Sequence, residues 1–182
     1  QHPRRRGEKL PGMRLVSLAR AAPRVRAAST AATPTLAAAL KVGDALRPRR
    51  RRFTEEDVAA YAGVSGDRNP VHLDDAFARG TGGFQRGRVV HGMLVASLFP
   101  ALIASHFPGA VYASQSLKFA APVHVGDEVV AQVQALHIKA TGARHIVKFA
   151  TRCFMDDEET LAIDGEAMAF LPTLQLSTEA IE

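Results

Sequence analysis

Hydrophobic and polar residues alternate along four segments in the second half of the chain. These segments cover residues 111–119, 128–138, 144–154 and 160–170, and turn residues separate them. Alternation with a period of two is typical of β-strands that bury one face. No helical pattern lies between the segments, so we expect them to form consecutive antiparallel strands of one sheet.

A run of almost entirely apolar and small residues, 93–107, precedes these strands. A surface helix carries a polar stripe, so this run predicts a helix that is buried on most of its circumference. Pro100 lies inside the run and lacks a backbone N–H, so we expect a kink or a break there. A curved antiparallel sheet wrapped around a central apolar helix, the hot-dog architecture, satisfies both patterns within one core. The sequence therefore predicts an α+β protein with a single hot-dog fold.

Short helices and loops are expected ahead of this central helix. Thr54 is followed by three acidic residues, which is the pattern of an N-cap and a first helical turn, and this helix should end near Gly63. Residues 65–74 are dense in Gly, Asn, Asp and Pro and predict an ordered loop. A further short helix is expected over residues 74–79.

The first 41 residues differ in composition from the rest of the chain. They hold nine Lys or Arg residues against one acidic residue, Glu8, and residues 13–40 contain no acid at all. Such an Arg-, Ala- and Ser-rich segment is typical of a mitochondrial or plastid transit peptide, with a disordered basic tail as the alternative. We expect a presequence over 1–41, the hot-dog domain over 42–172 and a C-terminal tail over 173–182.

Charge and cysteine content narrow the functional classes. Beyond residue 41 the chain has 14 basic and 17 acidic residues, so its positive charge belongs to the leader and does not indicate nucleic-acid binding. The basic run of Arg47 and Arg49 to Arg52 is interpreted as a solvated junction or as a contact surface for an acidic partner. A single cysteine, Cys153, indicates a reducing compartment. No apolar stretch approaches the roughly 18 residues of a spanning helix, so membrane insertion is not expected.

The loop at 65–74 concentrates the polar chemistry of the chain. Asp67 and His72 are five residues apart across a turn that Pro70 stiffens, so both side chains can point into one cavity. A carboxylate and an imidazole together can hold and polarise one water molecule, which suits adding water to an activated double bond or removing it. Asn69 lies between them and either contacts the reacting water or thioester, or only holds the loop.

The start of the central helix supplies a second part of a site. Unpaired N–H groups at a helix N-terminus can stabilise an enolate-like thioester oxygen, and Gly92 has no side chain to keep a carbonyl away. His91 is either a capping residue or a substrate contact. The hydroxyl of Ser97 either bonds back to the carbonyl of Met93 or reaches Asp67. The sequence contains no metal-ligand spacing and no cofactor motif, so neither a metal nor a cofactor is expected.

Four segments form a specific combination along the chain, namely residues 53–57, 65–74, 90–98 and 119–127. This combination resembles the MaoC-like, or type 2, enoyl-thioester hydratases, a family with the hot-dog fold, over roughly residues 42–172. The resemblance implies that Asp67 and His72 are the catalytic pair and that Asn69 supports them. It also implies that the backbone of Gly92 helps to bind the thioester oxygen.

Substrates in this family are (3R)-hydroxyacyl or trans-2-enoyl groups on coenzyme A or on acyl carrier protein. The resemblance therefore implies a dehydratase or hydratase, and a homodimer whose two sheets join and whose acyl tunnel runs beside the central helix. A single domain behind a mitochondrial-type leader resembles the dehydratases of mitochondrial type II fatty acid synthesis. This favours acyl carrier protein as the carrier, and the mitochondrial matrix over a plastid.

Three alternatives stay open at the level of the sequence. The chain could be an (R)-specific enoyl-CoA hydratase of fatty acid degradation, a hot-dog acyl-thioesterase, or a non-catalytic protein that binds acyl thioesters. Pro100 is unusual in the central helix of this family, so the depth of the tunnel and the preferred acyl length are left open.

Overall fold

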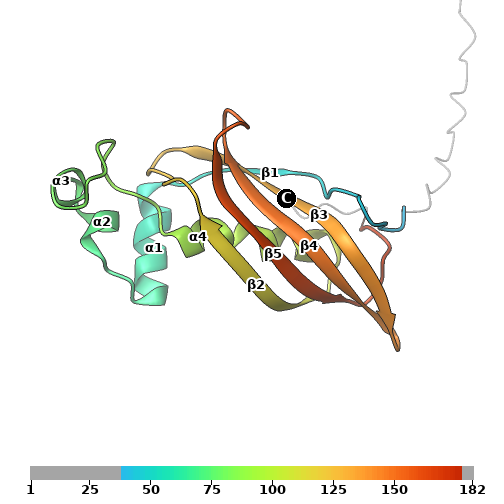
Figure 1. Cartoon of the computed structure of the whole chain (residues 1–182). Coiled ribbons are helices and arrows are strands. Elements are labelled where there is room, and N and C mark those ends of the chain that lie inside the picture. The colour runs from blue at the N-terminus through green and yellow to red at the C-terminus, as the bar shows by residue number, and fades with distance from the viewer. Residues whose placement is uncertain (1–37, 178–182) are drawn as a thin grey trace, which may run out of the picture. The chain divides into compact units, whose positions relative to one another are not determined.

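The structure, a computed structural model, describes residues 38–177, so most of the predicted presequence lies outside the described residues. A five-stranded antiparallel sheet in the order β1-β3-β4-β5-β2 lies over a broken central helix (Figure 1). The elements in chain order are β1 (Arg49–Arg52), α1 (Glu55–Ser65), α2 (Pro70–Leu73), α3 (Asp75–Arg79), α4 (Gly92–Ala96), α5 (Leu98–His106), β2 (Val111–Phe119), β3 (Glu128–Thr141), β4 (Arg144–Met155) and β5 (Leu161–Leu171).

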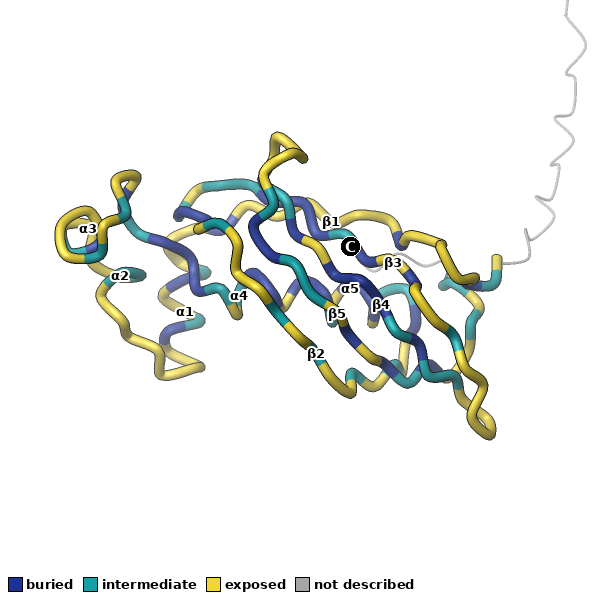
Figure 2. Tube along the Cα trace, viewed as in Figure 1, coloured by how far each residue is buried: buried dark blue, intermediate teal, exposed yellow. Residues whose placement is uncertain are grey.

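The four predicted strands are confirmed, and their bounds agree with the alternation of the sequence to within three residues. Inward-facing positions of β3 and β4 are buried against the central helix, as the dark segments of Figure 2 show for the middle of the sheet. Val133 and Phe149 belong to this core together with Phe99 and Ile103 of α5. The period-two pattern therefore identified the four strands, and in β3 and β4 it also identified the face that is buried.

The central helix is broken at Ser97, three residues before Pro100. Pro100 is the third residue of α5, and a proline is tolerated in the first helical turn because the N–H groups there have no intrahelical acceptor. The expected break is therefore confirmed, but its place is the start of the second helix. Burial is also less complete than expected, because four residues at helical spacing form an exposed stripe, namely Met93, Ser97, Ala101 and Ala104.

The arginine run forms an edge strand, which corrects its interpretation as a solvated junction. Strand β1 pairs with β3 from Arg49 opposite Ala131 to Arg52 opposite Glu128. Arg50 forms an ion pair with Asp156 (2.7 Å) and another with Glu158, both at the tip between β4 and β5. Arg50 therefore has acidic partners within the chain. Each exposed pair contributes at most about 1 kcal/mol to stability, so the backbone pairing carries the strand.

Helix α1 begins with a capping box. The Thr54 side chain accepts from the backbone N–H of Asp57, and the Asp57 carboxylate accepts from the backbone N–H of Thr54 at 3.0 Å. This second bond, together with Arg51, holds the pKa of Asp57 below its ordinary value. The helix ends at Ser65, two residues later than expected, because Gly66 adopts the left-handed conformation (φ 77°) that closes it.

Replacing Thr54 with Ala should lower the free energy of unfolding by about 1 kcal/mol, because one N–H at the start of α1 loses its acceptor. Chemical denaturation followed by circular dichroism measures the difference. Thr54→Ser keeps a hydroxyl at the cap and serves as the control that retains stability. An unchanged unfolding midpoint for the alanine variant would show that the cap does not stabilise α1.

The folded part extends past both predicted domain boundaries. Leu40 is buried, and its N–H donates to the carbonyl of Leu174 at 2.8 Å. Ala39 and Gln175 form an isolated β-bridge, and Leu176 also packs against the core. These leucines pack in or against the hydrophobic core, so folded residues lie on both sides of the boundaries expected at 41/42 and 172/173. Of the leader predicted over residues 1–41, residues 1–37 lie outside the described residues.

Cys153 lies on β4 and is completely buried in the core, where burial raises the pKa of its thiol to about 12. Within residues 38–177, none of the helices has the length and apolar character needed to cross a membrane.

Candidate active site

The loop between α1 and α2 brings the two predicted catalytic side chains together. The Asp67 carboxylate accepts from the backbone N–H of Asn69 at 3.1 Å. The Asn69 side-chain oxygen then accepts from the backbone N–H of Val71 at 3.3 Å, so Asn69 caps α2, with Pro70 as the first helical residue. This chain of local hydrogen bonds turns the backbone and presents His72 to Asp67.

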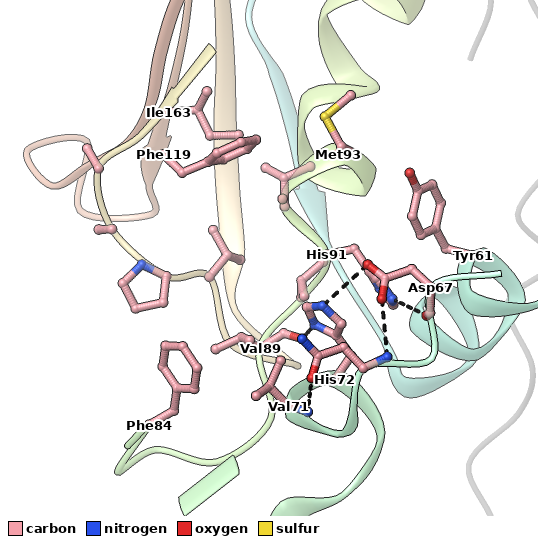
Figure 3. A pocket seen from close by; sticks show the side chains of 18 residues that line it. Tyr61, Asp67, Val71, His72, Phe84, Val89, His91, Met93, Phe119 and Ile163 are labelled. Atoms are coloured by element: carbon pink, nitrogen blue, oxygen red, sulfur yellow. Dashed lines mark hydrogen bonds and ion pairs between the residues drawn. The ribbon is translucent and has the colours of Figure 1, made fainter. Parts of the chain in front are cut away.

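His72 and Asp67 face one another at the mouth of a pocket (Figure 3). The Nδ1 atom of His72 lies 2.8 Å from the carbonyl oxygen of Val89. A carbonyl only accepts, so Nδ1 carries the hydrogen and the neutral ring presents the lone pair of Nε2. This Nε2 lies 3.8 Å from Oδ2 of Asp67. That separation is too long for a direct hydrogen bond and leaves room for one oxygen atom to contact both groups.

The segment that supplies the Val89 carbonyl is fixed by the loop that precedes β3. The Val90 N–H donates to Val123 at 2.8 Å, and the His124 ring lies 3.0 Å from the carbonyl of Gly87. Arg86 pairs with Asp127 through two hydrogen bonds. These contacts hold the carbonyl that orients His72, so part of the site is positioned by residues more than thirty positions further along the chain.

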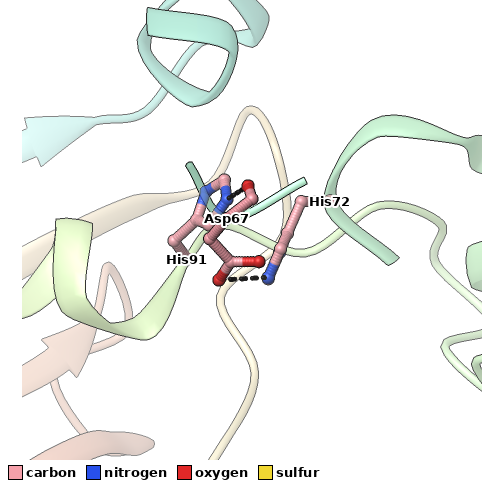
Figure 4. Close-up of side chains that lie close together, drawn as sticks. All are labelled: Asp67, His72 and His91. Atoms are coloured by element: carbon pink, nitrogen blue, oxygen red, sulfur yellow. Dashed lines mark hydrogen bonds and ion pairs between the residues drawn. The ribbon is translucent and has the colours of Figure 1, made fainter. Parts of the chain in front are cut away.

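His91 packs against the pair and is the N-cap residue of α4. Its side chain forms no capping hydrogen bond, and the residue is only 2% exposed. Its Nε2 lies 3.0 Å from the backbone carbonyl of Asp67, and its ring stacks on the His72 ring with centroids 3.8 Å apart (Figure 4). His91 therefore is the N-cap residue by position, but its side chain does not cap the helix and contacts both members of the pair instead.

Gly92 opens α4 against the ring of Phe119. A Cβ atom at this position would lie 2.6 Å from that ring, so the close approach requires glycine. Gly92 lines the pocket, and as the first residue of a helix its N–H has no intrahelical acceptor. The geometry thus provides a hydrogen-bond donor at the pocket wall.

The pocket has a volume of about 500 Å³, and five of the six predicted site residues line it. Ser97 does not, because its hydroxyl donates to the carbonyl of Leu94 at 2.6 Å on the exposed stripe. Apolar and aromatic residues that the sequence did not single out form much of the remaining wall, including Tyr61, Phe84, Met93, Phe119 and Ile163. Phe84 lies in a loop and the others in helices or strands, and their apolar character gave only a signal of core packing. The pocket combines a polar mouth with an apolar wall.

Asp67, His72 and His91 place ligand-type atoms within 4.8 Å of one another, which raises the question of a metal ion. The two imidazole rings are stacked with an interplanar angle of 27°. Nitrogen lone pairs lie in the ring planes, so stacked rings cannot both direct a lone pair at one ion about 2.0–2.1 Å away. One nitrogen of each ring also faces a backbone carbonyl. The arrangement suits proton transfer and the holding of water better than metal coordination.

The chain matches a known family model and is similar to proteins of named activity. A family model described as MaoC like domain matches residues 37–153. The chain is 52% identical over 152 residues to a protein of Arabidopsis thaliana that is named as a mitochondrial 3-hydroxyacyl-acyl-carrier-protein dehydratase. This match covers 84% of this chain and 88% of the relative. The chain is also 44% identical over 138 residues to the (R)-specific enoyl-CoA hydratase of Aeromonas caviae. That match covers 75% of this chain and 98% of the relative.

A solved structure supports the same grouping. The (R)-hydratase from A. caviae involved in PHA biosynthesis matches with a TM-score of 0.66 and 42% sequence identity, and the match covers 73% of this chain and 98% of that one. The antiparallel sheet and central helix of the two proteins thus share one fold, which confirms the architecture predicted from the sequence.

Proposed function

The chain belongs to the MaoC-like family, and we propose that it removes water reversibly from (3R)-3-hydroxyacyl thioesters to give trans-2-enoyl thioesters. One observation carries the proposal. The Asp67 carboxylate and Nε2 of His72 lie 3.8 Å apart at the mouth of a pocket of about 500 Å³ with an apolar wall.

In the hydration direction, the water oxygen lies between Asp67 and Nε2 of His72 and adds to C3 of the enoyl group. One water proton passes to this pair, the C2–C3 π electrons move toward the thioester oxygen, and C2 takes up a proton from the pair. Dehydration reverses each step, so the site returns to its starting protonation state and no redox partner is required. The pair acts as general acid and base.

The thioester oxygen gains negative charge while C2 is being protonated or deprotonated. In the proposal, the backbone N–H of Gly92 donates to this oxygen, and the absence of a Cβ lets the oxygen approach. Asn69 holds the loop through its cap on α2 and presents its remaining amide group to the pocket. Ser97 has no place in this scheme, because its hydroxyl is bonded to Leu94 outside the pocket wall.

Gly92→Ala should lower kcat/KM for hydration by about ten- to a hundredfold, because the new methyl group displaces the Phe119 ring and keeps the thioester from the helix start. Steady-state kinetics measure the change. Gly63→Ala is the matched control, since a Cβ at that helical position meets no atom within 4 Å and should leave activity unchanged. Equal activity of both variants would remove the role proposed for Gly92.

We propose acyl carrier protein as the physiological carrier and the mitochondrial matrix as the location. The name of the A. thaliana relative contains both 'acyl-carrier-protein' and 'mitochondrial', whereas the A. caviae relative is named as an enoyl-CoA hydratase. Both carriers present the same thioester group to the pair. The choice of carrier therefore concerns the surface around the pocket and leaves the chemistry unchanged.

We also propose a homodimer that forms along strand β2. This strand is the last in the sheet, so one of its edges has no hydrogen-bonded neighbour within the described residues. Val111 and Phe119 on it are 49% and 52% exposed, and the stripe of Met93, Ser97, Ala101 and Ala104 is exposed on the central helix. A second copy would cover both. Light scattering should then give twice the mass of one chain.

The test is hydration of a short trans-2-enoyl group offered in parallel on coenzyme A and on acyl carrier protein, with chiral analysis of the product. Formation of the (R)-3-hydroxyacyl product with a higher kcat/KM on the carrier protein supports the full proposal. A higher kcat/KM on coenzyme A would support the same reaction but would indicate a hydratase of fatty acid degradation. Release of free thiol without hydration would indicate a thioesterase, and binding without turnover a non-catalytic protein.

A further inference from the structure

His91 is a buried titratable group that the proposed reaction does not use. It lies between the β-bridge residue Val89 and the first residue of α4. Its ring is enclosed by His72 on one side, at 3.8 Å between centroids, and it also contacts the Tyr61 ring at 4.9 Å. Burying a polar side chain is costly, so a histidine that is only 2% exposed is expected to form specific contacts that offset this cost.

The hydrogen bonding of His91 fixes its tautomer. Its Nε2 lies 3.0 Å from the Asp67 carbonyl, which only accepts, so Nε2 carries the hydrogen and donates it. The other nitrogen, Nδ1, is buried and has no hydrogen-bond partner in the described part of the chain. A proton on Nδ1 would be a buried charge without a partner, so the ring is suited to hold its neighbours and not to exchange protons with substrate.

The His91 ring restrains both members of the pair: it stacks on the His72 ring and forms a hydrogen bond with the backbone of Asp67. Within the described residues the His72 ring has one hydrogen bond, to the Val89 carbonyl, and a single bond fixes one ring atom but leaves the ring plane free to rotate. The face of His91 supplies the missing restraint. Asp67 follows the left-handed residue Gly66 in an exposed loop, and the bond from His91 to its carbonyl anchors the backbone that carries the carboxylate.

We propose that His91 is a positioning residue that sets the separation and mutual orientation of Asp67 and His72, an inference that rests on the proposed function. His91 acts through these two residues and does not contact the reacting atoms. Loss of either restraint should therefore lower turnover without weakening substrate binding, because misplacement of catalytic groups by about 1 Å costs up to a hundredfold in rate.

Two substitutions separate the restraints. His91→Gln keeps an N–H donor for the Asp67 carbonyl but removes the ring face, whereas His91→Phe keeps a ring face but removes the donor. Each should lower kcat for enoyl-thioester hydration about tenfold and change KM less than about twofold. In an Asp67→Asn background the same substitutions should have almost no further effect, because the geometry that they disturb is no longer used.

His145→Gln is the matched control, because the Nδ1 atom of His145 is also buried without a partner while the residue lies outside the pocket wall. It should leave kcat unchanged. Unchanged kcat in both His91 variants overturns the proposal, and so does a rise in KM at constant kcat, which would indicate a substrate contact. A wild-type protein without hydration activity contradicts the proposed function instead.

A measurement on the wild-type chain keeps the proposal testable even if the variants do not fold. Two-dimensional NMR of protein labelled with ¹⁵N in its histidines distinguishes the tautomers of neutral imidazoles. The expected result is a hydrogen on Nδ1 of His72 and on Nε2 of His91. The opposite tautomer for His91 would mean that its ring does not donate to Asp67, and the proposal would be wrong.

Discussion

Asp67→Asn should lower kcat for enoyl-thioester hydration at least about a hundredfold while the protein stays folded, because an amide keeps the shape of the carboxylate but cannot take up or release the proton. The carboxylate is 51% exposed, so the change leaves no buried charge unpaired. Its hydrogen bond from the Asn69 N–H needs only an oxygen acceptor, which asparagine also offers. Steady-state kinetics with circular dichroism as a folding check measure the effect.

Asp164→Asn is the control for this substitution. Asp164 lies on β5, pairs with Arg152 at 3.2 Å and does not line the pocket, so its loss should leave kcat unchanged. An Asp67→Asn enzyme with more than half of the wild-type turnover would exclude Asp67 from the proton transfer and leave His72 to act alone.

His72→Gln should cause a loss of similar size, at least about a hundredfold in kcat, since the glutamine amide occupies the place of Nε2 without a basic lone pair. His137→Gln changes an exposed histidine of β3 and serves as the control. If Asp67 and His72 act on one water, the double variant should be scarcely slower than either single variant. Fully multiplied losses in the double variant would contradict a shared water.

Much of the fold was predictable because its signals are local. Alternation of side chains along 111–119 and the later segments follows from strand geometry alone, and the helix start at Thr54 follows from capping. The closeness of Asp67 and His72 was also local, since the turn at Pro70 brings residues five positions apart together. In each case the residues that decide the structure lie within about one turn or one strand of each other.

The features that the sequence did not predict depend on distant contacts. An arginine run gives no apolar alternation, and Arg49–Arg52 becomes a strand because β3 lies beside it. The ion pairs of Arg50 with Asp156 and Glu158 add a second long-range contact. His91 was read as a cap or a substrate contact, whereas its burial depends on stacking with His72 and on a bond to Asp67, 24 positions away. Ser97 was expected to bond to Met93 or Asp67, but the break of the helix directs its hydroxyl to Leu94.

Because the single cysteine of the sequence, Cys153, is buried, a label can be attached selectively at a cysteine introduced elsewhere. Since the thiol of Cys153 is inaccessible and ionises only near pH 12, maleimide reagents should modify the folded protein elsewhere only if a second cysteine is introduced. Ala143 is exposed in the turn between β3 and β4, away from β2 and from the pocket wall, and offers such a position. Copies that carry a donor dye there, mixed with copies that carry an acceptor dye, report the distance between two subunits by energy transfer. The rate at which Cys153 itself reacts measures how often the core opens.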